Sequence, residues 1–313
     1  MARRVQIIVT PGSGEGRTLV TAQHLHRLLR QRGDVSDIRT YESLAALRHW
    51  AQICARDFTS LVCVGGDATQ SAAAIAAMRL DVPFVPVPNG FGNIFGRVFE
   101  HPSDPEAVVN LLDEGEPQRV DVGMLNGSEV FLSHHSYGML QQVQEMVERP
   151  GEQPKSRGAR YLAYYVTARR LIVEAQPPCL RVEVDDTLVA EGAGLVTVAN
   201  VETYRGYLSL TPTASPLDGK FDVFIAPRTS HRRLVARLLG LMLGLSWKGV
   251  QRLRGRRVVV TDGDRREVLQ TVSGVLPLIV PPGSAARLDR RAGGVSVTDE
   301  RRAERPGWCA RAS

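Results

Sequence analysis

The first third of the chain alternates short, apolar, β-branched runs with stretches whose apolar residues recur at helical spacing. Residues 5–9 form a strand-like run, and residues 19–29 and 44–54 carry apolar side chains three and four positions apart. Two further strand-like runs follow at 61–64 and 83–87. Alternation of this kind is typical of a parallel sheet covered by helices. It predicts an α/β domain in which two helices follow the first strand.

Beyond residue 130, strand-like runs succeed one another. The expected strands cover residues 130–132, 180–184, 195–199, 207–210, 221–226, 257–260, 268–272 and 276–280. The expected helices of this part cover residues 161–173 and 232–245. Strands in succession predict a β-rich domain. We therefore divide the chain into an α/β domain at 1–122, a β-rich domain at 123–285 and an arginine-rich tail at 286–313, which we expect to be disordered.

Composition limits the functional class. The chain has 313 residues, about two domains' worth, of which 43% are hydrophobic and 23% are charged, so a wholly disordered or fibrous protein is excluded. The net charge is +6, and all but three of the 39 basic residues are arginine. Arginine binds phosphate through its planar guanidinium, although an arginine excess can also reflect genome composition. No nucleic-acid motif accompanies the charge.

Cysteine spacing and hydropathy bear on the cellular setting. The four cysteines form no C-x-x-C pair, which favours a reduced, cytoplasmic setting. The N-terminal apolar run is too short for a signal peptide. The longest apolar stretch, 234–247, is interrupted by Arg237 and is shorter than the roughly 20 residues of a membrane span, so we expect no integral membrane segment. The basic residues around this stretch could press on anionic lipid as a peripheral contact, and a core helix with basic ends explains the same pattern.

Glycine-rich turns follow three of the predicted strands. They lie at residues 10–16, at 65–69, which have the sequence Gly-Gly-Asp-Ala-Thr, and at 88–97. In an open α/β sheet the turns at the carboxyl ends of the strands share one edge, where ligands bind. Their backbone N–H groups can hold phosphate at a helix N-terminus. Taken alone, residues 65–69 could also be a tight strand-to-helix turn in which Asp67 caps the helix. Three glycine-rich turns at one edge favour a nucleotide-binding site over three unrelated loops.

Other chemical motifs are missing from the sequence. It contains no G-x-x-x-x-G-K-[ST] motif, and Arg17 stands where a Rossmann fingerprint starting at Gly12 has its third glycine. It contains no G-x-S-x-G motif, which argues against a serine hydrolase. Each histidine pair, 24/26 and 134/135, is spaced so that its members point in different directions, so neither predicts a metal site.

The glycine turns resemble motifs of the diacylglycerol kinase catalytic family, which includes sphingosine kinases and bacterial lipid kinases and is related to NAD kinases. Residues 65–69 resemble its G-G-D-G-T signature, 10–14 its N-P-x-S-G motif and 88–97 its P-x-G-T-G-N-D-x-A-R segment. Residues 121–127 resemble D-x-G-x-x-N-G, and 217–222 resemble the D-G-x-x-D turn. These motifs run in family order from about residue 3 to residue 285. Later motifs of NAD kinases are not apparent, so the lipid branch is the more similar one.

This resemblance implies a fold, a reaction and a set of site residues. The fold is a Rossmann-like α/β domain that holds ATP against a C-terminal β-sandwich, with lipid entering the cleft between them. The reaction is a Mg²⁺-dependent transfer of the γ-phosphate of ATP to a lipid hydroxyl such as that of diacylglycerol. The implied nucleotide contacts are Thr40, Gly65, Gly66, Asp67, Ala68, Thr69, Gln70, Ser71, Gly90, Gly92 and Asn93. The implied magnesium groups are Asp67 and Asp121, as parts of an aspartate–water–magnesium network, and Asp218 with backbone carbonyls near Ser215 and Lys220, as a structural magnesium loop.

Four positions depart from the family's pattern. Ala68 replaces a glycine, where a methyl group costs on the order of 1–2 kcal/mol if φ is positive. Phe91 replaces a threonine that touches the nucleotide, and Ile94 replaces an aspartate of the magnesium network. Val275 stands where the family has the carboxylate that accepts the proton of the lipid hydroxyl.

Loss of a general base typically slows a reaction by about 10²–10⁴-fold without abolishing it. Two hypotheses therefore stay open: an active lipid kinase, and a catalytically degenerate protein that binds nucleotide or lipid. Asp67 or Asp121 could serve as a substitute base. The sequence determines neither the lipid nor the oligomeric state.

Overall fold

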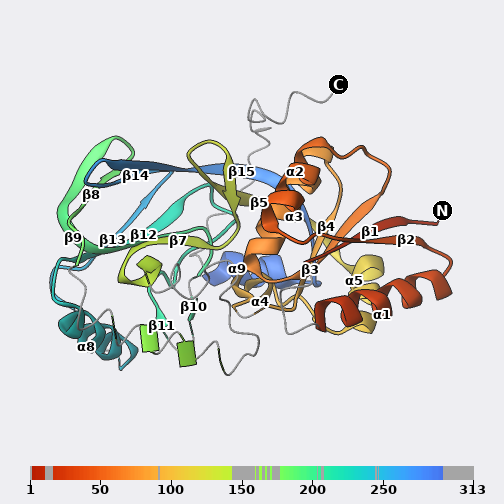
Figure 1. Ribbon diagram of the computed structural model, residues 1–313, viewed down its shortest axis with the longest axis horizontal. Coiled ribbons are helices and arrows are strands. Elements are labelled where there is room, and N and C mark those ends of the chain that lie inside the picture. Colours follow the sequence, from red (N-terminus) through yellow and green to blue (C-terminus); the bar gives the residue numbers. More distant parts are fainter. Residues whose placement is uncertain are drawn as a thin grey trace.

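The computed structural model places an α/β domain beside a β-sandwich, and one sheet runs through both (Figure 1). The expected fold class is confirmed. The described residues are 2–10, 17–90, 92–142, 159, 162–163, 166–167, 170, 177–202, 204–205, 208–243, 245 and 247–291.

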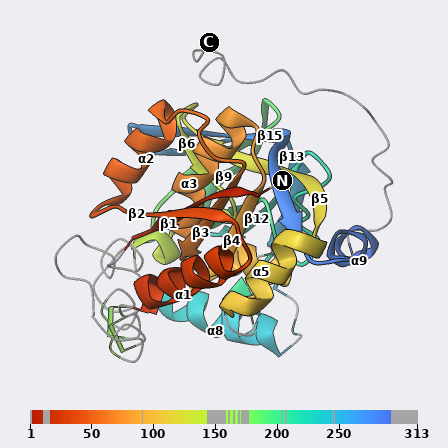
Figure 2. The same cartoon turned by 90° about the vertical axis from the view of Figure 1, so that its right-hand side faces the viewer.

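The N-terminal domain has a parallel sheet buried between two helical layers. Its strands lie in the order β4 (Phe84–Pro88), β3 (Ser60–Gly65), β1 (Arg4–Val9) and β2 (Val35–Thr40). Helices α2 (Leu44–Ile53) and α3 (Asp67–Leu80) cover one face, and α1 (Arg17–Gln31) and α5 (Pro105–Glu114) cover the other (Figure 2). Both faces of the sheet are buried because successive side chains point to opposite faces. In β1, Ile7 joins the core under α1, and Ile8 joins the core under α3.

The prediction that two helices follow the first strand directly is wrong, because β2 lies between α1 and α2. This strand pairs with β1 alone, and its side chains are exposed or half-buried. An edge strand of this kind needs no continuous apolar run, and its sequence Val-Ser-Asp-Ile-Arg-Thr has none.

The C-terminal domain is built from antiparallel strands. They are β5 (Glu116–Leu125), β6 (Glu129–Phe131), β7 (His134–Gly138), β8 (Leu180–Val184), β9 (Thr187–Ala199), β12 (Phe221–Pro227), β13 (Gln251–Gly255), β14 (Arg257–Asp262) and β15 (Arg265–Val280), with β10 (Tyr204–Arg205) and β11 (Leu208–Ser209) as a separate two-stranded sheet. Three further helices whose bounds the structure describes are α4 (Ile94–Val98), α8 (His231–Met242) and α9 (Ser284–Arg291). The predicted helix at 161–173 lies largely outside the described residues.

Two predictions near the C-terminus need correction. The strands expected at 268–272 and 276–280 are one strand, β15, whose pairing with β5 shifts register between Val272 and Leu276. The tail expected to be disordered from residue 286 begins inside helix α9.

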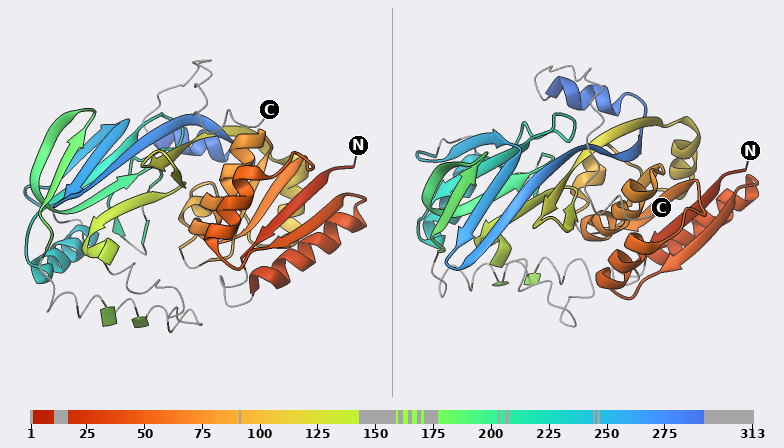
Figure 3. Two further views of the ribbon diagram at one scale, coloured as in Figure 1. Left: turned by 45° about the horizontal axis from the view of Figure 1, so that its top comes forward. Right: turned by 90° about the horizontal axis from the view of Figure 1, so that it is seen from above.

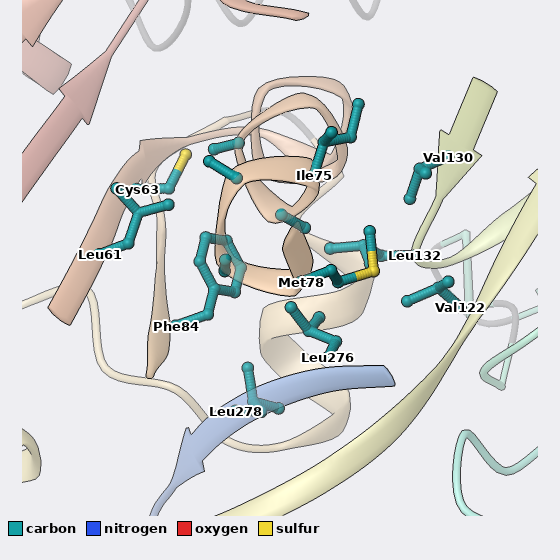
Figure 4. Packing of buried hydrophobic residues seen from close by; sticks show 14 of the residues in the cluster. Leu61, Cys63, Ile75, Met78, Phe84, Val122, Val130, Leu132, Leu276 and Leu278 are labelled. Atoms are coloured by element: carbon teal, nitrogen blue, oxygen red, sulfur yellow. The ribbon is translucent and has the colours of Figure 1, made fainter. Parts of the chain in front are cut away.

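Strands β5 and β15 join the two domains (Figure 3). Strand β15 pairs with β5 along most of its length and meets β4 through Leu278 and Phe84. The boundary expected at residue 122 therefore falls inside β5. Side chains of both strands pack with Ile75 and Met78 of α3 in a single core (Figure 4). Because this core is shared, the position of α3 relative to the sandwich is set by close packing.

No helix in the described part of the chain is both long enough and apolar enough to cross a bilayer.

Candidate active site

The glycine turns that follow β3 and β4 converge at the N-terminus of α3. The N–H of Asn89 donates to the Gly65 carbonyl over 3.1 Å. A Cβ built on Gly90 would lie 2.3 Å from Gly66 Cα, which is closer than real Cβ contacts come. The two backbones therefore touch, and glycine is required at the point of contact.

Asp67 ties the second turn to the first. Its Oδ1 accepts a 3.0 Å hydrogen bond from the N–H of Phe95 in α4, and a Cβ on Gly92 would lie 2.9 Å from its Oδ2. Burial raises the pKa of this carboxyl, while the backbone N–H groups of Phe95 and Ile94 oppose the rise. The carboxylate is thus turned toward the N-terminus of α4, where negative charge is favoured, and it does not cap its own helix.

Three buried side chains of α3 brace the backbone of the glycine turn at residues 65–67. Thr69 Oγ1 and Thr10 Oγ1 lie 2.8 Å apart, which brings the end of β1 to the site. Gln70 Nε2 donates to the Gly65 carbonyl over 3.0 Å, and Ser71 Oγ donates to the Asp67 carbonyl over 2.8 Å. The third glycine turn, residues 11–16, lies outside the described residues. Because these side chains point inward, the groups left to meet a ligand are the first-turn N–H groups of α3, which have no intrahelical partner.

The strain expected at Ala68 is absent. Ala68 is exposed in the first turn of α3 and is not among the described residues with positive φ. The steric demand lies instead at Gly65, where a Cβ would lie 2.8 Å from Thr69 Cβ. The methyl group of Ala68 therefore leaves the loop geometry intact.

The second turn is closed by Asn93. Its Oδ1 accepts the Gly90 N–H over 2.7 Å, its Nδ2 donates to the Gly90 carbonyl over 2.9 Å, and its own φ is +53°. Ile94 is buried in the shared core with α3, so the position where the family has an aspartate carries an apolar side chain. Phe91 lies outside the described residues. Thr40 is exposed at the end of β2, separated from β3 by β1.

Asp121 is the centre of the second half of the site. This residue of β5 is buried, and its carboxylate accepts backbone N–H groups from Gly219 over 2.6 Å and from Gly274 over 2.8 Å. Burial raises the pKa of Asp121 to about 6, against the lowering effect of the two N–H groups and of Arg256. Asp121 thereby holds together the D-G-x-x-D turn and the irregular segment of β15 that contains Val275.

A chain of hydrogen bonds links the backbone carbonyl of Asp121 to Ser71 of α3, whose hydroxyl bonds the glycine turn at Asp67. Ser71 Oγ accepts the N–H of Leu132 over 3.3 Å. Asn200 Nδ2 donates to the carbonyls of Leu132 and Asp121 over 3.0 and 2.9 Å. Sequence reasoning missed Asn200. The available signal was a lone amide directly after the apolar run 195–199, at the end of a strand.

The D-G-x-x-D turn carries an ion pair that bears on the magnesium prediction. Asp218 Oδ1 accepts the Lys220 N–H over 3.0 Å, and Asp218 Oδ2 pairs with Arg254, whose Nε lies 3.5 Å from Asp222 Oδ2. Ser215 Oγ is buried and has no partner among the described residues. Both carboxylate oxygens of Asp218 are engaged and a guanidinium supplies the cation. The residues present therefore do not fit a structural Mg²⁺ at Asp218.

Within the ranges that the structure describes, no group of three His, Cys, Asp or Glu side chains could hold a metal ion. A magnesium ion carried by a nucleotide needs less, because it is usually held by one or two carboxylates together with substrate phosphates. Among the described residues, Asp67 is a carboxylate that lies at the glycine turn after β3.

Val275 lies beside Gly274 in the segment held by Asp121. Its side chain is half-buried and packs against the shared core. It carries no group that accepts a proton. The D-G-x-x-D turn packs against this segment of β15, since a Cβ built on Gly219 would lie 2.9 Å from Ser273 Oγ.

The geometry described above and the β-sandwich define a two-domain protein of the lipid kinase and NAD kinase class. Residues 4–125 match the diacylglycerol kinase catalytic domain, and residues 136–279 match the YegS C-terminal NAD kinase β-sandwich-like domain. The chain belongs to the family of bacterial diacylglycerol kinases and their YegS-like relatives.

Individual relatives agree with this assignment. The chain is 27% identical over 237 residues to the diacylglycerol kinase of Staphylococcus saprophyticus, a match that covers 75% of this chain and 76% of that protein. It is 28% identical over 240 residues to the diacylglycerol kinase of Mycobacterium tuberculosis, covering 74% and 76%. A Bacillus anthracis chain crystallised as a candidate diacylglycerol kinase shares the fold with a TM-score of 0.69 at 18% identity, covering 90% of this chain and 96% of that one.

Proposed function

We propose that this protein is an ATP-dependent lipid kinase that transfers the γ-phosphate to a lipid hydroxyl such as that of diacylglycerol. The observation that carries the proposal is the contact between the turns after β3 and β4 at the N-terminus of α3. Backbone N–H groups at a helix N-terminus favour phosphate, and the hydrogen-bonded path through Ser71, Leu132 and Asn200 connects α3 to the backbone carbonyl of Asp121, whose buried carboxylate lies on the same residue. The relatives named diacylglycerol kinase support the same reaction.

Phosphoryl transfer needs positioning and charge stabilisation more than covalent chemistry from the protein. We assign positioning of the triphosphate to the first turn of α3 and to the second turn at Gly90, Gly92 and Asn93. Magnesium bound to the triphosphate neutralises its negative charge, and Asp67 would be its protein ligand. We place the protein in the cytoplasm, the compartment that supplies ATP.

Asp121 is the proposed proton acceptor in place of Val275. With its pKa raised to about 6, the carboxylate is ionised at neutral pH and basic enough to take a proton. If it has this role, kcat falls as the pH drops below about 6, and Asp121→Asn lowers kcat by about 10²–10⁴-fold and leaves a residual activity without this acid limb. A purely structural role lowers activity without changing the shape of the pH profile.

The alternative function, binding without phosphoryl transfer, is favoured by two observations. Ile94 is buried in the core and Val275 packs against it, so both positions lack the family's carboxylates. In this alternative the protein binds nucleotide or lipid and forms no product.

One experiment separates the two functions. Purified protein is incubated with γ-labelled ATP, Mg²⁺ and lipid–detergent micelles containing diacylglycerol or other lipid alcohols, while binding of a fluorescent ATP analogue is measured in parallel. Labelled lipid supports the kinase, and nucleotide binding without product selects the alternative. Val275→Glu restores a carboxylate and Val275→Gln adds the same bulk without a base. If the missing base limits the rate, Val275→Glu is faster than Val275→Gln by about 10²-fold or more.

A further inference from the structure

Helix α8 has one face in the protein core and a second, apolar face in solvent. On the inner side, Leu234 and Leu238 pack with Phe224 and Trp247. The core helix considered from the sequence is therefore present. The same helix and the turn after it, however, expose Leu239, Leu243 and Leu245 to 53%, 79% and 62%. Burial of the inner face does not account for these three side chains.

The exposed leucines are grouped. Arg232, Leu239 and Leu243 are spaced by seven and four residues, which places them on one side of the helix. Leu162 and Val166 are also exposed, and Ala163, beside Leu162, packs against the same cluster as the inner face of α8. Single exposed leucines are ordinary, whereas a contiguous apolar patch marks a contact surface. We call the set Leu239, Leu243 and Leu245 the α8 patch.

The charge around the α8 patch has one sign. Residues 227–250 contain five basic residues and no acidic residue. Arg232 and Arg233 are exposed, and within the described part of the chain no acidic side chain pairs with either. Arg237 is exposed and lies over the Trp247 ring at 5.5 Å. A binding partner for this surface must therefore carry negative charge beside an apolar interior.

An anionic bilayer surface has both properties. Aliphatic side chains on one side of a helix, with arginine at its polar boundary, are typical of helices that lie in the membrane interface. Arginine adds attraction to anionic head groups while its stem stays in apolar surroundings. Helix α8 also lies at the end of the molecule opposite the N-terminus, along the outside of the sandwich (Figure 1). Among the described residues, nothing buries Leu239, Leu243 and Leu245, so a bilayer can reach them without displacing a described element.

We propose that the α8 patch and the arginines at the N-terminal end of α8 dock this protein on anionic membranes. The inference deepens the proposed function, since a kinase whose substrate is a bilayer lipid must meet that bilayer. Docking is peripheral: three leucines enter the interface and the arginines contact lipid phosphates.

The test measures membrane binding without ATP, so that it does not depend on catalysis. The full chain is co-sedimented with vesicles of phosphatidylcholine alone and with vesicles containing 30% phosphatidylglycerol. We expect binding to the anionic vesicles only, weakening as salt rises. Arg232→Gln with Arg233→Gln is expected to weaken binding about 25-fold, at about fivefold for each arginine near the surface. Leu239, Leu243 and Leu245, all changed to Ser, are expected to weaken it at least tenfold.

A matched control uses equally exposed apolar residues at the other end of the molecule. Val20, Val35 and Ile53 are exposed to 66%, 57% and 65%, and their replacement by Ser is expected to leave vesicle binding unchanged. Circular dichroism verifies that each variant is folded. Wild-type protein that ignores anionic vesicles, or α8 variants that bind like wild type, would overturn the proposal. So would a dimer, detected by light scattering, that the leucine substitutions dissociate, because a second copy of the chain would then cover the patch.

Activity measurements distinguish failure of this inference from failure of the proposed function. The α8 variants are expected to keep wild-type turnover of a short-chain lipid alcohol dispersed as monomers, and to lose turnover of the same head group in vesicles. Vesicle binding that depends on α8 in a protein without kinase activity would refute the proposed function and leave the docking surface standing.

Discussion

The most direct test of the site is Asp121→Asn, because the structure predicts how its effect on stability depends on pH. Burial raises the pKa of Asp121 from 3.8 to about 6, even though its carboxylate accepts two backbone N–H groups. This rise makes the ionised form about 3 kcal/mol less favourable in the folded protein than in the unfolded chain. The neutral acid and the asparagine amide, by contrast, are similar in shape and charge.

The direction of the pH effect on stability follows from the raised pKa of Asp121. A carboxyl whose pKa is raised by folding contributes its stability fully below pH 3.8, and that contribution is lost as the pH rises through about 6. Asparagine does not titrate. The free energy of unfolding of the wild type, minus that of Asp121→Asn, is therefore expected to fall by about 3 kcal/mol between pH 3.5 and pH 7.5.

Urea unfolding of both proteins across this pH range provides the measurement. Taking the difference removes the contributions of all other titrating groups. Asp264→Asn, in the exposed turn between β14 and β15, is the control for replacing a carboxylate by an amide. A difference that stays constant, or that grows in favour of the wild type with rising pH, would mean that the N–H groups of Gly219 and Gly274 outweigh desolvation, and would refute the reasoning.

Three further predictions concern the loops around this carboxylate. In Gly90→Ala the new Cβ would lie 2.3 Å from Gly66 Cα. We expect this variant to lose at least about 2 kcal/mol of the free energy of unfolding in urea and to lose binding of the ATP analogue. The control Ala68→Gly should lose no more than about 1 kcal/mol. Asn200→Ala, which removes two buried hydrogen bonds, should lower the free energy of unfolding by about 2–3 kcal/mol, whereas Asn110→Ala, which removes one exposed hydrogen bond from Arg32, should lower it by no more than about 1 kcal/mol. Without nucleotide, the melting temperature should be the same in EDTA and in Mg²⁺, because Arg254 already pairs with Asp218. A rise in Mg²⁺ that disappears in Asp218→Asn would contradict this last expectation.

The sequence determined the α/β class and the edge at which the candidate site forms. Strands buried on both faces read as continuous apolar runs, and helices read as a period of three to four residues, so both signals are local. The glycine pair at 65–66 and the glycines at 90 and 92 could be placed at one edge because all parallel strands end on the same side. The convergence of those two turns was therefore predictable, and the contact between Gly66 and Gly90 agrees with it.

Only the tertiary structure decided where the side chains of the site point. Asp67 turns to α4, Ile94 enters the core, and Asn200 reaches β5 from a strand about 80 residues away in sequence. Spacing along the chain does not encode such contacts, because they depend on which elements pack together. The edge strand β2 has no apolar run that would mark it in the sequence. The continuity of β15 is likewise visible only in its pairing with β5 and β4. The exposed side of α8 could not be predicted from the sequence either, because whether a leucine is buried depends on its neighbours in space.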